Sequence, residues 1–323
     1  MVHFPFMRWV AGAALAAATF GGAIAQDYPS KPVRIIVPAA AGGATDLIGR
    51  LIGQQLSDQW RKPVVVENRP GAGAAIGSDH VAKSAPDGHT LLVSAFSHTV
   101  NPALMEKLPY DSIRDFTPIV KMMNFPSVLV VNAGLPITNL KEFIDYARAN
   151  PKKLVFALGA IGTSQQMAGA LLGATARIEF LQVPYKGGGP AMTDLLGGHA
   201  SFMIESIPTA LPHIQSGKIR AIGITSATRS KTLPEVPSIG ETAVPGFDVN
   251  SWFGLHGPSG LPPRIAQQIH RDVAEILAKP EVVDKLAAMG TQIHVLGPAD
   301  FAAFVASETA RWGKVVREVG IKN

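Results

Sequence analysis

The sequence predicts an α/β protein in which sheets are flanked by helices. Short apolar runs, which suit buried strands, alternate with amphipathic segments, which suit helices, and glycine-containing loops connect several of them. The 323 residues include 32 glycines and 25 prolines, a composition that suits many tight connections. This alternation of strand, loop and helix is typical of mostly parallel sheets with crossover helices.

The first half of the chain contains strand patterns separated by helices. Residues 33–38 form a continuous apolar run, as expected for a strand buried on both faces. A helix is predicted over 47–59, a strand over 63–67, a helix over 74–83 and a strand over 90–94. Two further strings, 116–123 and 127–132, have the composition of strands.

The second half repeats the alternation and ends in helices. A helix is expected after Thr138 and Asn139, with Thr138 as its cap. Strands are predicted over 154–157, 180–183, 201–204 and 219–225, and helices open after the loops 159–164 and 187–190. A proline-rich surface loop is expected over 233–247. Helices are expected over 263–278, 281–289 and 298–319.

The length suits one large domain or two lobes, and no long flexible linker divides the chain. Two lobes would have to be joined through ordered segments, for which 117–133 and 247–257 are the candidates. We expect a discontinuous first lobe, residues 26–125 plus 250–323, and a second lobe, residues 126–249.

The first 25 residues have the pattern of a secretory signal peptide. Arg8 precedes an apolar run that ends in Ala23-Ile24-Ala25, a small-x-small cleavage site. The run is shorter than the roughly 20 residues of a membrane span, although an uncleaved anchor is the alternative. We expect cleavage near Ala25 and a periplasmic mature chain.

Composition excludes several classes of function. The chain has no cysteine, which removes thiol catalysis and zinc–thiolate sites. The formal charge of +5 becomes +4 once Arg8 is subtracted, and the positive residues form no block. This small excess favours anionic small ligands slightly and does not indicate nucleic acid.

Four glycine-containing loops each follow a predicted strand and open a helix. They are Ala41-Gly42-Gly43, Gly71-Ala72-Gly73, Gly159 to Ser164, and Lys186-Gly187-Gly188-Gly189. Glycine lets the backbone approach a ligand, and free N–H groups at a helix start attract an anion. A single such loop is often only a turn, but four at the carboxyl ends of strands predict a cleft that captures a carboxylate.

Side chains near these loops have competing interpretations. Asp46 is a capping or loop-bracing carboxylate, Thr163 and Ser164 are ligand donors or helix caps, and Lys186 is a point charge or a solvated lysine. His98 has the most site-like position among the histidines, with a loop histidine bonded to backbone as the alternative.

No enzyme motif is present. The chain lacks the G-x-S-x-G, H-E-x-x-H, S-x-x-K and P-loop patterns, and its histidines show no metal-ligand spacing. Gly71 to Gly77 resembles a dinucleotide fingerprint, but no acidic residue follows the next strand, which ends at Ser94 to Ser97. We therefore expect no catalytic residue, no metal and no cofactor.

The ordered motifs of the mature chain resemble the periplasmic substrate-binding receptors of tripartite tricarboxylate transporters, the Bug receptors. The motifs that carry this resemblance are Tyr28 to Arg34, Ala40 to Asp46, Glu67 to Gly73, Leu108 to Asp111, Gly162 to Ser164, Val183 to Gly188, Asp194 to Gly198, Trp252 to Gly254 and Arg311 to Val316.

The resemblance implies a two-lobed Venus-flytrap fold that binds one small organic carboxylate between its lobes and presents it to membrane transporter subunits. It implies a monomer and a ligand set made of Ala41, Gly42, Gly43, Thr45, Asp46, Gly71, Ala72, Gly73, Phe96 and His98 in the first lobe, with Gly162, Thr163, Ser164, Tyr185, Lys186, Gly187 and Glu205 in the second.

Two positions depart from the family pattern. Gln166 stands where histidine is frequent, and Glu205 stands where a shorter acid is frequent. An exported enzyme acting on a carboxylate or ester, and a sensor-linked binding protein, are the alternative functions.

Overall fold

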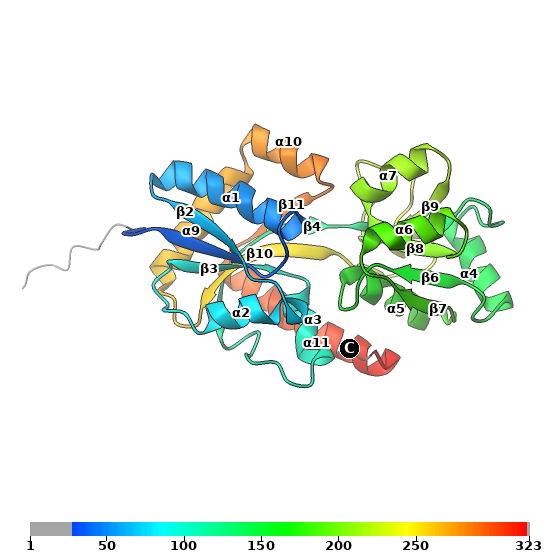
Figure 1. Ribbon diagram of the computed structural model, residues 1–323, viewed down its shortest axis with the longest axis horizontal. Helices are drawn as coiled ribbons and strands as arrows, with labels where there is room; N and C mark the ends of the chain where they lie inside the picture. The colour runs from blue at the N-terminus through cyan, green and yellow to red at the C-terminus, as the bar shows by residue number, and fades with distance from the viewer. Residues whose placement is uncertain (1–27, 322–323) are drawn as a thin grey trace, which may run out of the picture.

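The computed structural model describes residues 28–321, which form two lobes, each with a sheet between helices (Figure 1). The expected signal peptide and its cleavage site lie outside the described residues. One sheet has six strands in the order β11-β4-β10-β3-β1-β2, and the other has five in the order β7-β6-β8-β5-β9.

The elements of the six-stranded lobe come from both ends of the described chain. Its strands are β1 (Val33–Val37), β2 (Val64–Asn68), β3 (Thr90–Ala95), β4 (Phe116–Phe125), β10 (Ser251–Pro258) and β11 (Gln292–Leu296). Its helices are α1 (Ala44–Trp60), the 3-10 helix η1 (Ala72–Ala74), α2 (Ala75–Ala82), α3 (Ser97–Leu104), α9 (Pro263–Leu277), α10 (Pro280–Ala288) and α11 (Pro298–Val319).

The elements of the five-stranded lobe are continuous in sequence. Its strands are β5 (Ser127–Asn132), β6 (Val155–Leu158), β7 (Leu181–Pro184), β8 (Phe202–Ser206) and β9 (Ile219–Ile224). Its helices are α4 (Leu140–Ala149), α5 (Ser164–Ala176), α6 (Gly188–Leu196), α7 (Ile207–Gln215) and α8 (Ile239–Thr242).

Continuous apolar runs bury both faces of the central strands. In β1, Ile35 packs in the core beneath α1 and α9, and Ile36 packs in the cluster beneath α2. In β5, Leu129 and Val128 likewise belong to separate clusters. Successive strand residues point to opposite faces, so a continuous apolar run predicts burial on both.

The sheets are mixed, so the expectation that they are mostly parallel was wrong. β1 pairs in parallel with β2 and β3, and β6 pairs in parallel with β7 and β8. The strands β4, β5, β9, β10 and β11 pair with their neighbours in the two sheets in antiparallel fashion. Strands that carry the chain directly between sheets have no crossover helix, so nothing forces them to run parallel to their neighbours.

The chain passes between the sheets at two points. β4 in the first sheet and β5 in the second are separated by Pro126 alone. On the return, Val249 still donates its N–H to Thr225 O (2.8 Å) in the second lobe, while Ser251 begins β10 in the first. The C-terminal helix α11 also joins the lobes, because it contacts both α3 and α5.

Other local expectations need correction. The segment 233–247 contains the short helix α8, and its Leu233, Val236 and Phe247 side chains are buried, so it is not a surface loop. Asn139, not Thr138, caps α4, and its side chain accepts the Glu142 N–H (2.9 Å). The helices α3 and α7 and the strands β10 and β11 were not predicted.

Candidate functional site

The loop-bearing edges of the two sheets face each other across the chain crossing. The carboxyl end of β3 is level with the start of β10, where Ala95 pairs with Phe253. The carboxyl end of β8 is level with the start of β5, where Ser206 pairs with Ser127. Since parallel strands end at one edge, the loops after β1, β2 and β3 open toward those after β6, β7 and β8.

Helix α3 links the two sets of loops. Asn101 Nδ2 donates to Gly73 O (2.8 Å) in the first lobe. A Cβ atom built on Gly162 of the second lobe would lie 3.5 Å from Leu104 Cδ1. The expected loops of both lobes therefore approach a common region at this helix.

The loop between β1 and α1 is held open by a buried carboxylate. Gly42 has a φ of 85°, and its N–H donates to Asp46 Oδ2 (2.9 Å). Arg50 Nε donates to the same oxygen (2.9 Å), and Asn68 Nδ2 donates to Asp46 Oδ1 (2.9 Å). The Arg50 hydrogen bond is the largest of the causes that lower the Asp46 pKa to about 2.

This geometry gives Asp46 a bracing role. Both of its oxygens are occupied by protein donors, so it shapes the loop in front of α1. The exposed residues of that loop are Ala40, Ala41, Gly42 and Gly43, and Thr45 is half-buried in the first helical turn. Gly43 caps α1 without a side-chain hydrogen bond, which leaves the first-turn N–H groups available to an anion.

The loop after β2 has a left-handed backbone. Gly71 has a φ of 124°, and Ala72, Gly73 and Ala74 all have positive φ values. A Cβ atom at Gly71 would lie only 2.6 Å from Ile76 Cδ1, so the close turn requires glycine there. Gly71, Ala72 and Gly73 are exposed beside the first loop.

The loop between β6 and α5 is braced in the same way as the first-lobe loop, with a side-chain amide in place of the carboxylate. Gly162 has a φ of 76°, and its N–H donates to Gln166 Oε1 (2.8 Å), as Gly42 does to Asp46. Thr163 caps α5, with its Oγ1 accepting the Gln166 N–H (3.3 Å). Ser164, which is 5% exposed, bonds to Gln165. Gln166 therefore braces the loop in the place of the expected histidine.

The loop between β7 and α6 borders a cavity of about 370 Å³. Gly187 has a φ of 120° and precedes α6, and its N–H donates to Gly159 O (3.0 Å). Tyr185 Oη donates to Asp194 Oδ2 (2.6 Å), and the Lys186 side chain is exposed. Glu205, at the end of β8, also lines the cavity. The residues around it are Gly159, Ala160, Thr163, Gln165, Gly187, Gly188, Gly189, Met203, Ile204, Glu205 and Thr209.

Two expected ligand residues have buried side chains instead. Phe96 is 3% exposed and packs edge-on against Trp312 (ring centroids 5.1 Å apart). His98 is 2% exposed, bonds through Nε2 to Ser112 O (2.9 Å) and lies 4.6 Å from the His256 ring. Burial lowers the His98 pKa to about 4. Both side chains are buried in this structure, so their assignment to the ligand stays a prediction that their burial does not support.

Several residues at the loop edges were not singled out from the sequence. Ser97 is half-buried at the start of α3, at the same edge as the loops after β1 and β2. Ala160, Gly189 and Thr209 border the second-lobe cavity. Ser97 and Thr209 belong to α3 and α7, two helices that were not predicted, so the sequence provided no reason to place them at the loop edges. Gly189 belongs to a loop that was already recognised.

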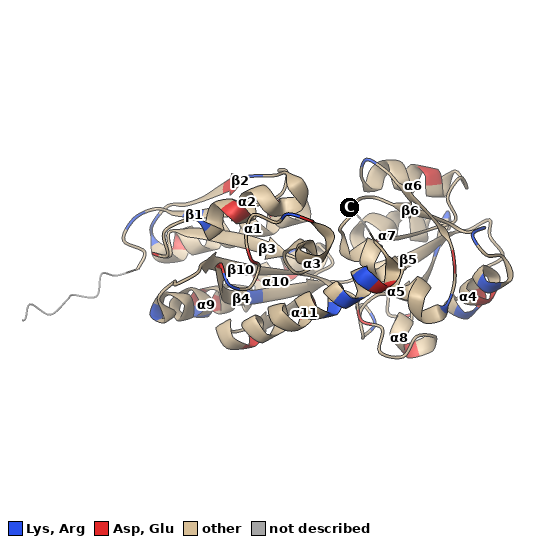
Figure 2. Cartoon of the chain, turned by 90° about the horizontal axis from the view of Figure 1, so that it is seen from below, with Lys and Arg blue, Asp and Glu red and all other residues tan. Residues whose placement is uncertain are grey.

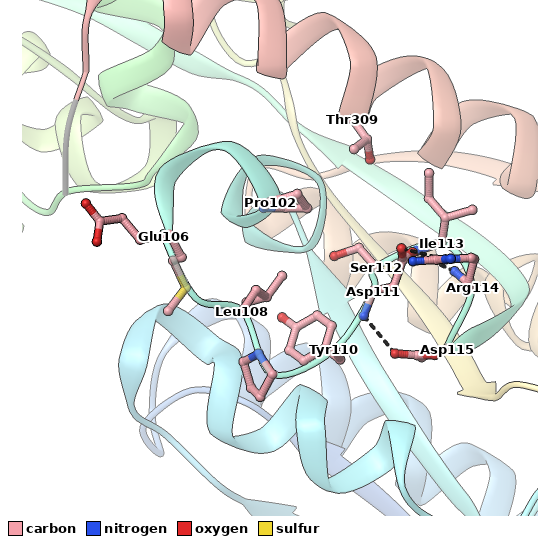
Figure 3. A pocket seen from close by; sticks show the side chains of 12 residues that line it. Pro102, Glu106, Leu108, Tyr110, Asp111, Ser112, Ile113, Arg114, Asp115 and Thr309 are labelled. Carbon is pink, nitrogen blue, oxygen red and sulfur yellow. Dashed lines mark hydrogen bonds and ion pairs between the residues drawn. The ribbon is translucent and has the colours of Figure 1, made fainter.

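A larger cavity, of about 590 Å³, lies outside these loops (Figure 3). It is formed by segment 102–115 and Thr309. Two of its acidic side chains bond to neighbours in the same segment, since Asp115 Oδ2 accepts the Asp111 N–H (2.7 Å) and Asp111 Oδ2 accepts Arg114 Nε (2.8 Å). None of the facing loops after β1, β2, β6 and β7 contributes a residue to the lining of this cavity.

The remaining features of the described chain add no metal or membrane site. Lys, Arg, Asp and Glu are dispersed over both lobes (Figure 2). Residues 28–321 contain no group of three or more His, Asp or Glu side chains arranged to hold a metal ion. Within the same residues, no helix is long and apolar enough to cross a membrane.

Comparison with known proteins identifies the family of this chain. The model of the "Tripartite tricarboxylate transporter family receptor" matches residues 48–321. Protein BugT of Bordetella pertussis is 39% identical over 316 residues, which cover 97% of each chain. These matches confirm the resemblance that was stated from the motifs.

Solved structures share the two-lobed architecture. R. palustris Rpa4515 with adipate is 33% identical with a TM-score of 0.80, covering 92% of this chain and 100% of that chain. MatC from Rhodopseudomonas palustris with bound malate is 32% identical with a TM-score of 0.75, covering 90% of this chain and 100% of that chain. These findings confirm the expected two-lobed α/β fold and point to a receptor and not to an enzyme. The chain belongs to the receptor family of tripartite tricarboxylate transporters.

Proposed function

We propose that this chain is an extracytoplasmic receptor that captures a small organic carboxylate between its lobes and delivers it to the membrane subunits of a tripartite tricarboxylate importer. The observation that carries the proposal is the facing arrangement of the glycine-containing loops at the carboxyl ends of β1, β2, β6 and β7. Adipate in Rpa4515 and malate in MatC support this ligand class.

Main-chain amides supply the attraction in this proposal. The N–H groups of Gly42, Gly162, Tyr185 and Gly187 bond within the protein and shape the loops. The amides left for the ligand are those of Gly43 and Gly71 to Gly73 in the first lobe, and of Thr163, Ser164 and Lys186 in the second. Each charge-assisted hydrogen bond contributes roughly 1.5–3 kcal/mol net. Three or four such bonds, after the entropy costs of binding, give about −8 kcal/mol, which is micromolar affinity.

The proposed movement is a closure of the lobes around the ligand. We assign residues 26–125 and 250–323 to the first lobe and 126–249 to the second, with the hinge at Pro126 and Asn250, where the chain changes sheet. A ligand that touches both lobes favours the closed form, which the membrane subunits can then recognise.

The first test is a thermal-shift screen of the purified mature protein against dicarboxylates, citrate-like acids, acidic amino acids and aromatic carboxylates. Titration calorimetry follows for every compound that raises the Tm. The proposal expects a carboxylate that raises the Tm and is recovered chemically unchanged. Conversion of that compound by the pure protein would favour an exported enzyme, and absence of any carboxylate binding would refute the proposal.

The proposal places the mature receptor in the periplasm as a monomer, with its signal removed near Ala25. Mass spectrometry of the protein from the periplasmic fraction gives the mature N-terminus. Size-exclusion chromatography with light scattering gives its mass in solution, for which the proposal expects one chain.

A further inference from the structure

The second-lobe cavity contains one acidic side chain in a neutral lining. Of the described residues that border it, Glu205 alone carries a formal charge, and the polar neighbours Thr163, Gln165 and Thr209 are neutral. Lys186 belongs to the loop between β7 and α6, but its side chain is exposed and it is not among the lining residues. The half of the site that faces the far end of a ligand therefore presents an acid without a compensating cation.

The Glu205 carboxyl lies against the start of α6. A Cβ atom built on Gly188, the first residue of that helix, would lie 2.8 Å from Glu205 Oε2. The protein thus places its own carboxyl group beside the backbone N–H groups that would otherwise be open to an anionic ligand. A side chain at position 188 would require the Glu205 carboxyl group to move, so glycine permits the placement that is observed.

The two oxygens of Glu205 have different surroundings. Oε1 accepts the Ser206 N–H (2.6 Å). Oε2 accepts no hydrogen bond from residues 28–321 and adjoins Gly188, which borders the same cavity. Burial raises the Glu205 pKa, as expected for a carboxyl group without a cationic partner. Oε2 is therefore the acceptor that remains for a ligand.

These contacts have a direct consequence for ligand choice, provided that the proposed function holds. We propose that Glu205 makes this receptor select a ligand with a single carboxylate, whose far end is a hydrogen-bond donor, either hydroxyl or ammonium. The first-lobe amides hold the carboxylate, and Glu205 Oε2 accepts from the donor. A second carboxylate in the same place would meet a like charge and would leave Oε2 without a donor.

This selection differs from that of the two similar structures, whose ligands adipate and malate are both dicarboxylates. The test uses titration calorimetry with length-matched acids. One set has four carbons (succinate, 4-hydroxybutyrate and 4-aminobutyrate), and the other has six (adipate, 6-hydroxyhexanoate and 6-aminohexanoate). The hydroxy and amino members distinguish the two donor types.

The test variant is Glu205→Gln, which keeps the size of the side chain and removes its charge. The control is Glu179→Gln, the same change at an exposed acid that lies 3.6 Å from Lys152. We expect the unaltered protein to bind a donor-bearing acid about tenfold more tightly, or better, than the dicarboxylate of equal length. Glu205→Gln should lower the ratio of the two Kd values by about fivefold or more, and Glu179→Gln should not change that ratio.

Two results would overturn the inference. One is a dicarboxylate that binds the unaltered protein as well as its donor-bearing counterpart, and the other is a Glu205→Gln variant with an unchanged ratio. Dicarboxylate binding would still leave the proposed function standing. If folded protein binds no member of either set or of the wider carboxylate screen, the proposed function fails and the inference fails with it.

Discussion

Replacing Gly43 by leucine separates ligand binding from folding. Gly43 has a φ of −79° and a ψ of 167°, which any residue can adopt. The nearest heavy atom to a Cβ atom built there is Ala40 O at 3.7 Å, an ordinary contact. The residue is exposed at the start of α1. A leucine side chain should therefore leave the fold intact while it fills the space in front of the α1 amides.

The magnitude follows from the hydrogen bonds that the side chain would block. Losing two amide–carboxylate bonds at roughly 1.5 kcal/mol each costs about 3 kcal/mol, or about 150-fold in Kd. Titration calorimetry with the tightest ligand from the screen measures this change, and the Tm of the free protein checks the fold. Gly43→Ala, which adds one methyl group, should lose less. An unaltered Kd for Gly43→Leu at an unaltered Tm would refute the loop assignment.

Three further predictions concern the groups that support the site. Asp46→Asn should lower the free energy of unfolding by about 2 kcal/mol at pH 7, since the folded pKa of about 2 lies below the ordinary 3.8. The Asp46 contribution to the free energy of unfolding is present above pH 4 and is lost toward pH 2. The free energies of the two proteins, measured by urea unfolding, should therefore become equal in acid. A difference that stays constant with pH would contradict the bracing role. Gln166→Ala should weaken ligand binding by about fivefold, because Gly162 loses its acceptor, and an unchanged Kd in calorimetry would show that the bond is dispensable. His98 has a folded pKa of about 4 against an ordinary 6.5, so its burial should destabilise the fold as the pH falls from 6.5 to 4, by about 3 kcal/mol at most. In His98→Gln the Tm should therefore fall less steeply with pH in that range. An identical dependence of Tm on pH in the two proteins would show that another group causes the acid sensitivity.

Strong local patterns explain why much of the fold was predictable. The run at β1 is apolar at every core position, and the tail segment from Pro298 has a helix-starting proline, so both elements were predicted close to their observed bounds. The family motifs gave the two-lobed architecture, which the solved structures confirm. The mixed sheets were not predictable in this way, because strand direction depends on where the chain crosses between lobes.

The details of the site depend on tertiary contacts that sequence patterns do not carry. Phe96 and His98 lie where a strand passes into a helix, as ligand-binding residues often do, but their side chains turn into the core against Trp312 and His256. Gln166 looked like a departure from the family pattern at the ligand. In the structure it is the second-lobe counterpart of Asp46, a role that only the pairing of Gly162 with Gln166 reveals.

The most direct test of the account is a crystal structure with a bound carboxylate from the screen. The account predicts one carboxylate group between the lobes, within hydrogen-bond distance of main-chain N–H groups from the loops at Gly42–Gly43 or Gly71–Gly73, with the second-lobe loops closed over the remainder of the ligand. A carboxylate held outside those loops, for example in the cavity around Tyr110 to Asp115, would contradict it.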